Sequence, residues 1–177
     1  MKYVNYQDIP QRLKAYYTVD IPLSSLQYTL DHYKERHGLE LNPDFQRGHV
    51  WSEEQQISYV EYLLSQPDRD KSTSVVFNKA GWQTGRISSK PMVCVDGLQR
   101  ITACIAFLDN KIKVYDTYYK DYEGHLPDYP GLQFTIGGFK NREEVLQWYL
   151  QINAMGTPHT KEELDRVRDM LEDINDN

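Results

Sequence analysis

The chain has little of what marks several large classes of protein. It holds only 2 cysteines among 177 residues, Cys94 and Cys104, which lie in apolar surroundings without the spacing of metal ligands. No apolar run approaches the roughly 20 residues that cross a bilayer, and the first residues lack the apolar stretch of a secretory signal. We therefore expect a cytoplasmic protein with reduced core cysteines, without a disulfide framework and without a membrane partner.

The chain also lacks any segment rich in lysine and arginine, and its net charge is −6. Non-specific binding to nucleic acid depends on cationic side chains that neutralise phosphates, so a general DNA-coating role is disfavoured. The negative net charge still allows a local basic groove, because Arg47, His49 and Arg100 could converge in space. A Walker-type glycine-rich loop with lysine is absent as well.

Apolar periodicity indicates the elements that the chain does contain. We expect helices over 21–38, 52–66, 98–109, 141–153 and 160–174, and strands at 73–79, 91–95, 111–115 and 133–136. Capping pairs start three of these helices: Ser52 with Gln55, Asn141 with Glu144, and Thr160 with Glu163. Helices interleaved with hairpin-like strands favour an α+β fold over a doubly wound sheet. We expect a single domain over 1–177, with 141–177 as its C-terminal helical portion.

Five residues between a predicted strand and a predicted helix are the most informative feature. The segment 96–100 reads Asp-Gly-Leu-Gln-Arg. Such a turn presents backbone N–H groups, a helix N-terminus and a cationic side chain to one small volume, which suits a phosphate. Gly97 would let the backbone approach a ligand closely, Arg100 could fork onto phosphate oxygens, and Asp96 could orient the arginine or hold a metal ion. The simpler interpretation is a structural turn in which Asp96 caps the helix.

Two further segments strengthen this pattern. One reads Asn-Pro-Asp-Phe-Gln-Arg-Gly-His-Val-Trp over 42–51, and the other reads Ile-Asn-Ala-Met-Gly-Thr-Pro-His-Thr over 152–160 and runs into Glu163. With the segment 96–100 between them, they resemble the GmrSD-type restriction-enzyme N-terminal domain family, over about residues 21–165. That family is known for an Asp-Gly-Gln-Gln-Arg motif. The resemblance implies a ParB/sulfiredoxin-like fold, with a small mixed sheet, flanking helices and a C-terminal helical part.

The resemblance also implies a ligand and a set of site residues. ParB-like and sulfiredoxin-like relatives bind nucleotide phosphates at the matching turn, so we expect a nucleoside triphosphate (NTP) with Mg²⁺. The residues expected to bind the nucleotide are Gln46, Arg47, Gly97, Gln99, Arg100, Asn153 and Thr157. Asp96 is the candidate metal ligand. Asp96 and His49 are the candidate catalytic residues, since hydrolysis would need a group that positions water or takes a proton.

Most of these residues also have a structural interpretation. The amides of Gln46 and Gln99 could satisfy buried backbone groups, Asn153 could cap the end of its helix, and Arg47 could pair with a surface carboxylate. Arg100 lies in the first turn of a predicted helix, where the helix dipole disfavours a cation. A bound anion or a buried carboxylate would resolve that conflict.

The chain departs from the family pattern in three ways. Leu98 stands in place of the first glutamine of the turn, which removes one amide unless the side chain points into the core. His159 replaces the usual leucine. Nothing in the sequence resembles the HNH-type nuclease domain of full-length restriction members, so we expect no complete restriction nuclease in this chain alone.

Three functions remain open from the sequence. The first is an NTP-binding, and in some members NTP-hydrolysing, regulatory domain of the restriction or defence type. The second is a stand-alone interaction or inhibitor protein that acts on a restriction or defence partner, which the acidic charge suits. The third is a ParB-like DNA nuclease, which needs a metal held by clustered carboxylates. The expected partners are a nucleotide and either DNA, through a local groove, or a nuclease, while the oligomeric state stays undetermined.

Overall fold

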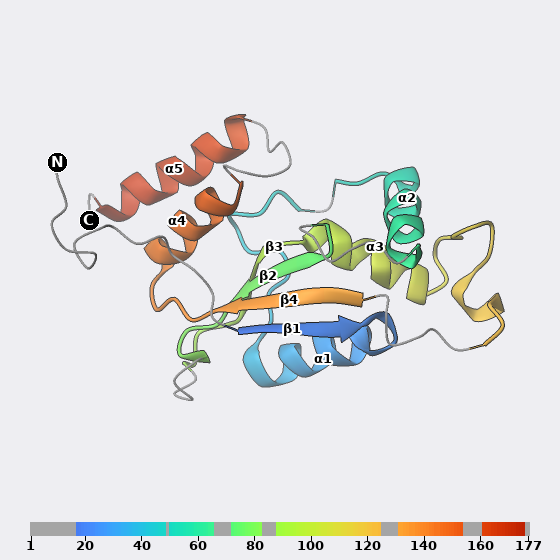
Figure 1. Cartoon of the computed structure of the whole chain (residues 1–177). Helices are drawn as coiled ribbons and strands as arrows, with labels where there is room; N and C mark the ends of the chain where they lie inside the picture. The colour runs from blue at the N-terminus through green and yellow to red at the C-terminus, as the bar shows by residue number, and fades with distance from the viewer. Residues whose placement is uncertain are drawn as a thin grey trace, which may run out of the picture.

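The computed structural model describes residues 17–48, 50–65, 72–82, 88–124, 131–153 and 161–175. Within these residues, four strands form one mixed sheet in the order β1-β4-β2-β3 (Figure 1). The strands are β1 (Tyr17–Pro22), β2 (Ser74–Asn78), β3 (Val93–Asp96) and β4 (Gly131–Gly137). The pairs β1–β4 and β2–β3 are antiparallel, whereas β2 and β4 run parallel.

Helices cover both faces of this sheet. The described residues form α1 (Leu26–His37), α2 (Glu53–Leu64), α3 (Leu98–Leu108), α4 (Arg142–Asn153) and α5 (Lys161–Asn175), with short 3₁₀ turns at Leu23–Ser25 and Tyr119–Asp121. Because side chains alternate along a strand, β2 sends Val75 and Phe77 to one face and Val76 to the other. The first face packs on α1, α2 and α3, and the second on α4 and α5, which lie together at one end in Figure 1.

These observations confirm the predicted α+β class, with a small mixed sheet, flanking helices and a C-terminal helical part. The ParB/sulfiredoxin-like assignment and the single-domain boundaries stay predictions. Two capping boxes are confirmed: Ser52 Oγ accepts from the Gln55 N–H at 3.3 Å, and Asn141 Oδ1 accepts from the Glu144 N–H at 2.8 Å. Thr160 lies outside the described residues.

Two sequence predictions were wrong. The strand expected at 111–115 is instead irregular, because Tyr115 and Asp116 take positive φ angles of 49° and 58° and close a tight turn between Val114 and Thr117. The strand β1 was missed, since the first helix was expected to begin at Ile21, where β1 is still paired with Leu132 of β4.

The core holds both cysteines. Cys94 and Cys104 are free and buried, and burial raises the pKa of the Cys104 thiol to about 12. Burial likewise raises the pKa of Cys94. Both thiols therefore stay protonated at neutral pH and behave as small apolar core residues. None of the helices within the described residues combines the length and the apolar character needed to cross a membrane.

Candidate functional site

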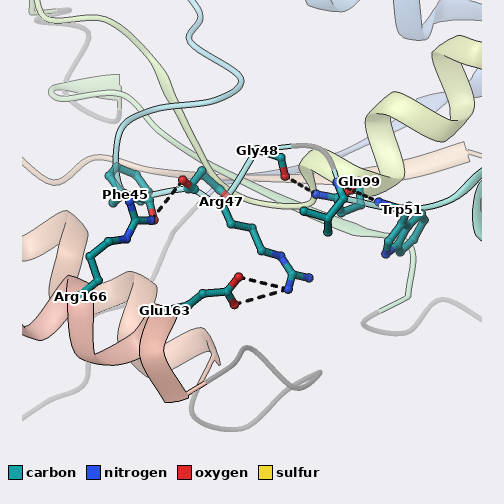
Figure 2. Close-up of polar contacts among 9 residues, drawn as sticks. Phe45, Arg47, Gly48, Trp51, Gln99, Glu163 and Arg166 are labelled. Carbon is teal, nitrogen blue, oxygen red and sulfur yellow. Dashed lines mark hydrogen bonds and ion pairs between the residues drawn. The ribbon is translucent and has the colours of Figure 1, made fainter.

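Two of the three predicted segments meet at one hollow beside the end of β3. The hollow has a volume of about 60 Å³ and is lined by Gln46, Arg47, Trp51, Asp96, Gly97, Leu98, Gln99 and Arg100. The loop 42–51 and the turn 96–100 are therefore neighbours in space, as Figure 2 shows for Arg47, Gly48, Trp51 and Gln99.

The turn 96–100 is built around Gly97. This residue is the N-cap of α3 in a left-handed conformation, with φ 103°. A Cβ atom there would lie 2.9 Å from Val75 Cγ2 and 3.0 Å from Val75 Cα, so only glycine fits between β2 and the helix. Because its N-cap is a glycine, α3 has no N-cap side chain that could accept from its first N–H groups. The interpretation of Asp96 as the helix cap was wrong.

The Asp96 side chain binds Arg100 instead. Arg100 Nη1 donates to Asp96 Oδ2 at 3.1 Å and to the Ser74 carbonyl oxygen at 2.7 Å. The guanidinium is only 15% exposed, and this carboxylate balances its charge in the first turn of α3. Among the described residues, these bonds use Nη1 alone, which leaves Nε and Nη2 as donors for a ligand.

The two predicted glutamines hold the loop 42–51 against the sheet. Gln46 Nε2 donates to the carbonyl oxygens of Cys94 and Val95, at 3.1 and 2.9 Å. Gln99 Oε1 accepts from the N–H groups of Val50 and Trp51, and its Nε2 donates to the Gly48 carbonyl at 2.6 Å. These bonds fit the structural interpretation of both amides. A direct contact of Gln46 or Gln99 with a nucleotide stays a prediction.

Helix α5 contributes two side chains that the sequence interpretation did not place at the site (Figure 2). Arg47 Nη1 donates to both carboxylate oxygens of Glu163, at 3.3 and 3.4 Å. Arg166 donates to the carbonyl oxygens of Asp44, Phe45 and Gln46 at 3.1–3.2 Å. The sequence did point to Glu163 as a site residue, because it ends the third family segment, but it was assigned only a capping role. Arg166 had no such signal.

The third predicted segment lies mostly beyond the described residues, which exclude Thr157 and also His49 from the loop. Asn153 is described, and its Nδ2 donates to the Tyr149 carbonyl at 2.8 Å, so it binds the last turn of its own helix.

Burial raises the pKa of Tyr149 to about 12, and the Glu163 and Asp96 carboxylates add to this effect. Tyr149 therefore keeps its phenolic proton at neutral pH.

Leu98 and Trp51 line the hollow from its apolar side. Leu98 is 7% exposed and belongs to the main core, as expected if its side chain points inward. Trp51 packs on that core and against Tyr59, with ring centroids 5.3 Å apart. Both residues give the hollow a rigid wall, which favours a fixed geometry for the charged side chains beside them.

Asp96 is the one predicted metal ligand. In the part of the chain that the structure describes, no three His, Cys, Asp or Glu side chains gather closely enough to hold a metal ion. Mg²⁺ is commonly bound through one or two carboxylates together with the phosphates of its substrate and water. Asp96 therefore fits Mg²⁺ only as a partner to a bound phosphate, and a site formed by the protein alone is not indicated.

A second hollow of about 320 Å³ is larger and contains none of the predicted site residues. It lies on the α4 side of the sheet, between Phe45, Val93 and Phe139, with Arg142 at its edge. Arg142 is bound there to both carboxylate oxygens of Asp44, at 3.0 and 2.8 Å.

The comparison with protein families agrees with this arrangement of segments. The family model of the GmrSD restriction endonuclease, N-terminal domain, matches residues 28–144, which include the loop 42–51 and the turn 96–100. Searches of curated proteins and of solved structures found no match. Since the family model covers well over half of the chain, the protein belongs to the GmrSD restriction endonuclease N-terminal domain family, and thus to a family of the restriction type.

Proposed function

We propose that this domain binds the phosphate groups of a nucleoside triphosphate in the hollow between the loop 42–51 and the turn 96–100, as a regulatory domain of the restriction type. One observation carries the proposal: Arg47 and Arg100 line the same hollow, which also borders the N-terminal residues Leu98 and Gln99 of α3. Guanidinium groups and the N–H groups of a helix N-terminus are donors that proteins commonly use for phosphate oxygens.

The size of the hollow supports a phosphate rather than a whole nucleotide. Its volume is about 60 Å³, whereas pockets that enclose drug-sized ligands measure about 300–1,000 Å³. We infer that one phosphate enters the hollow and that the sugar and base lie outside it. The base preference then depends on surfaces beyond these eight lining residues.

Each polar side chain has a role in this proposal. Arg100 would bind a phosphate oxygen through Nε and Nη2, while Asp96 and the Ser74 carbonyl keep its guanidinium in place. Asp96 would also complete the coordination of Mg²⁺, which neutralises phosphate charge when bound. Gln46 and Gln99 would act by positioning the loop. Hydrolysis would need Asp96 or His49 to orient water. Since Asp96 is already paired with Arg100, we propose nucleotide binding and leave hydrolysis outside the proposal.

The test is calorimetric titration of the whole chain with ATP, GTP, CTP and UTP in the presence of Mg²⁺. Arg100→Lys keeps the charge but loses the forked donor set, and Arg47→Ala removes the second cation. We expect micromolar binding of one nucleotide and a loss of about tenfold or more in each variant, since a charged hydrogen bond contributes about 1.5–3 kcal/mol.

Two variants serve as controls. Arg168→Ala removes an exposed arginine of α5 whose ion pair within the described residues is with Asp165, three residues away. Lys140→Ala removes a cation that lines the second hollow. Both should leave the affinity unchanged. If Lys140→Ala alone weakened binding, the nucleotide would lie in the larger hollow, and if no nucleotide bound at all, a partner-binding role would replace this proposal.

A further inference from the structure

The two arginines of the hollow are paired in different ways. Arg100 is held within its own strand–turn–helix unit, by Asp96 four residues earlier and by the neighbouring strand β2. Arg47 is held by Glu163 of α5, which is 116 residues away in the sequence. The carboxylate on Arg100 is thus part of the sheet edge, whereas the carboxylate on Arg47 belongs to a separate helix.

Glu163 places an anionic group on one nitrogen of Arg47. Both of its oxygens lie within 3.4 Å of Nη1, and the two side chains are 28% and 20% exposed. Arginine binds a phosphate in bidentate form through two of its nitrogens, and Nη1 is one of them when the phosphate lies at the end of the guanidinium. A phosphate bound in this way and the Glu163 carboxylate would therefore compete for Nη1.

Other contacts hold α5 in place without Glu163. Val167 is fully buried, and Leu164, Met170, Leu171 and Ile174 pack against the same apolar cluster. Arg166 binds three successive carbonyl groups of the site loop. A rotation of the Glu163 side chain would therefore free Arg47 while the helix stays docked.

We propose that Glu163 is an internal competitor for the phosphate ligand, which holds Arg47 until a phosphate displaces it. The inference rests on the proposed phosphate site and adds its regulation: Glu163 lowers the affinity of the empty site, and ligand binding releases the Glu163 carboxylate from the loop. The opposite role predicts the opposite result. If Glu163 instead orients Arg47 toward the ligand, removal of the Glu163 carboxylate weakens ligand binding.

The experiment compares pyrophosphate and NTP binding, by calorimetry on the whole chain, for the wild type and for Glu163→Gln, Glu163→Asp and Glu162→Gln. Glu162→Gln removes the same charge from the adjacent, exposed position and controls for the net charge of the chain. Glu163→Asp keeps the competing carboxylate. We expect Glu163→Gln to bind pyrophosphate about three- to tenfold more tightly, as the loss of an ion pair worth about 1 kcal/mol implies, and the other two variants to resemble the wild type.

The outcomes separate the two proposals. Equal or weaker pyrophosphate binding by Glu163→Gln, with normal NTP binding by the wild type, overturns the competitor role alone. Tighter pyrophosphate binding by Glu163→Gln, with no NTP binding by any variant, supports the competitor role and overturns the nucleotide as ligand. No binding of either ligand to any variant overturns both. Thermal unfolding of each variant checks that α5 remains docked, and Arg166→Ala provides the reference for a loosened helix.

Discussion

The turn 96–100 and the loop 42–51 form two sides of one hollow, yet they are held in different ways. The turn is fixed within the unit of β2, β3 and α3, by Gly97 against Val75 of β2 and by Asp96 on Arg100. The loop is fixed by partners far away in the sequence, from Gln99 on one side and Arg166 on the other. The comparison shows that one half of the site is built with the sheet, while the other half depends on the docking of α5.

The largest effect that separates the two sides is expected from glycine substitutions. Gly97→Ala combines a φ of +103° with a Cβ position 2.9 Å from Val75, so we expect a loss of about 3–5 kcal/mol in the free energy of unfolding. Gly48→Ala in the loop has a φ of +76° and only an ordinary contact at 3.7 Å, so we expect about 1 kcal/mol. Urea denaturation measures both, and equal losses would contradict the steric argument.

The next effect concerns the hydrogen bonds that join the two sides. Gln99→Ala leaves the Val50 and Trp51 N–H groups and the Gly48 carbonyl without their amide partner, and we expect a loss of about 2 kcal/mol. Gln27→Ala is the matched control, since the Gln27 side chain donates to the exposed Asp31 one turn away. Amide hydrogen exchange should also accelerate at Val50 and Trp51. Unchanged exchange there would show that Gln99 does not hold the loop.

A smaller effect tests the dependence of the loop on α5. Arg166→Ala removes three hydrogen bonds to loop carbonyls, part of which water replaces because the side chain is exposed, and we expect about 1–2 kcal/mol. Arg168→Ala, two residues later, should change stability by less than about 0.5 kcal/mol. Denaturation of both variants measures the difference. Equal stabilities would mean that the apolar contacts of α5 alone fix the loop.

The smallest effect is expected at the other end of the β2–β3 hairpin, remote from both sides of the site. Burial lowers the pKa of His37 from its ordinary 6.5, the Lys79 charge adds to this, and Nδ1 is buried with no hydrogen-bond partner among the described residues. Below pH 6.5 the unfolded chain therefore binds more protons than the folded one, and stability should fall as the pH drops from 7 to 5.

Thermal unfolding across this pH range measures that decline. His37→Gln should flatten it, whereas His32→Gln, which removes only one of the smaller causes of the lowered His37 pKa, should flatten it less. The turn 96–100 and the loop 42–51 should both be unaffected by the protonation of His37, because no contact joins either of them to His37 in the described residues. A slope that is independent of His37 would move the explanation to the carboxylates.

Short-range signals account for what could be predicted of the fold. Ser52 and Asn141 were correctly identified as helix caps because a capping box is complete within four residues. The tight turn at Tyr115 and Asp116 was missed, since positive φ angles are uncommon outside glycine and neither residue signals them. The strand β1 was missed because its partner β4 lies far along the chain, and a short edge strand has little periodicity of its own.

The sequence by itself determined the family, the order of its segments and the position of the turn 96–100 between a strand and a helix. Only the tertiary structure decided that Glu163 neutralises Arg47, that Gln46 and Gln99 bind backbone groups, and that a hollow forms between the loop 42–51 and the turn. The physical reason is the separation in sequence between the residues that make contact. Contacts within a turn follow from local spacing, whereas a side chain paired across 116 residues depends on how the helices dock on the sheet.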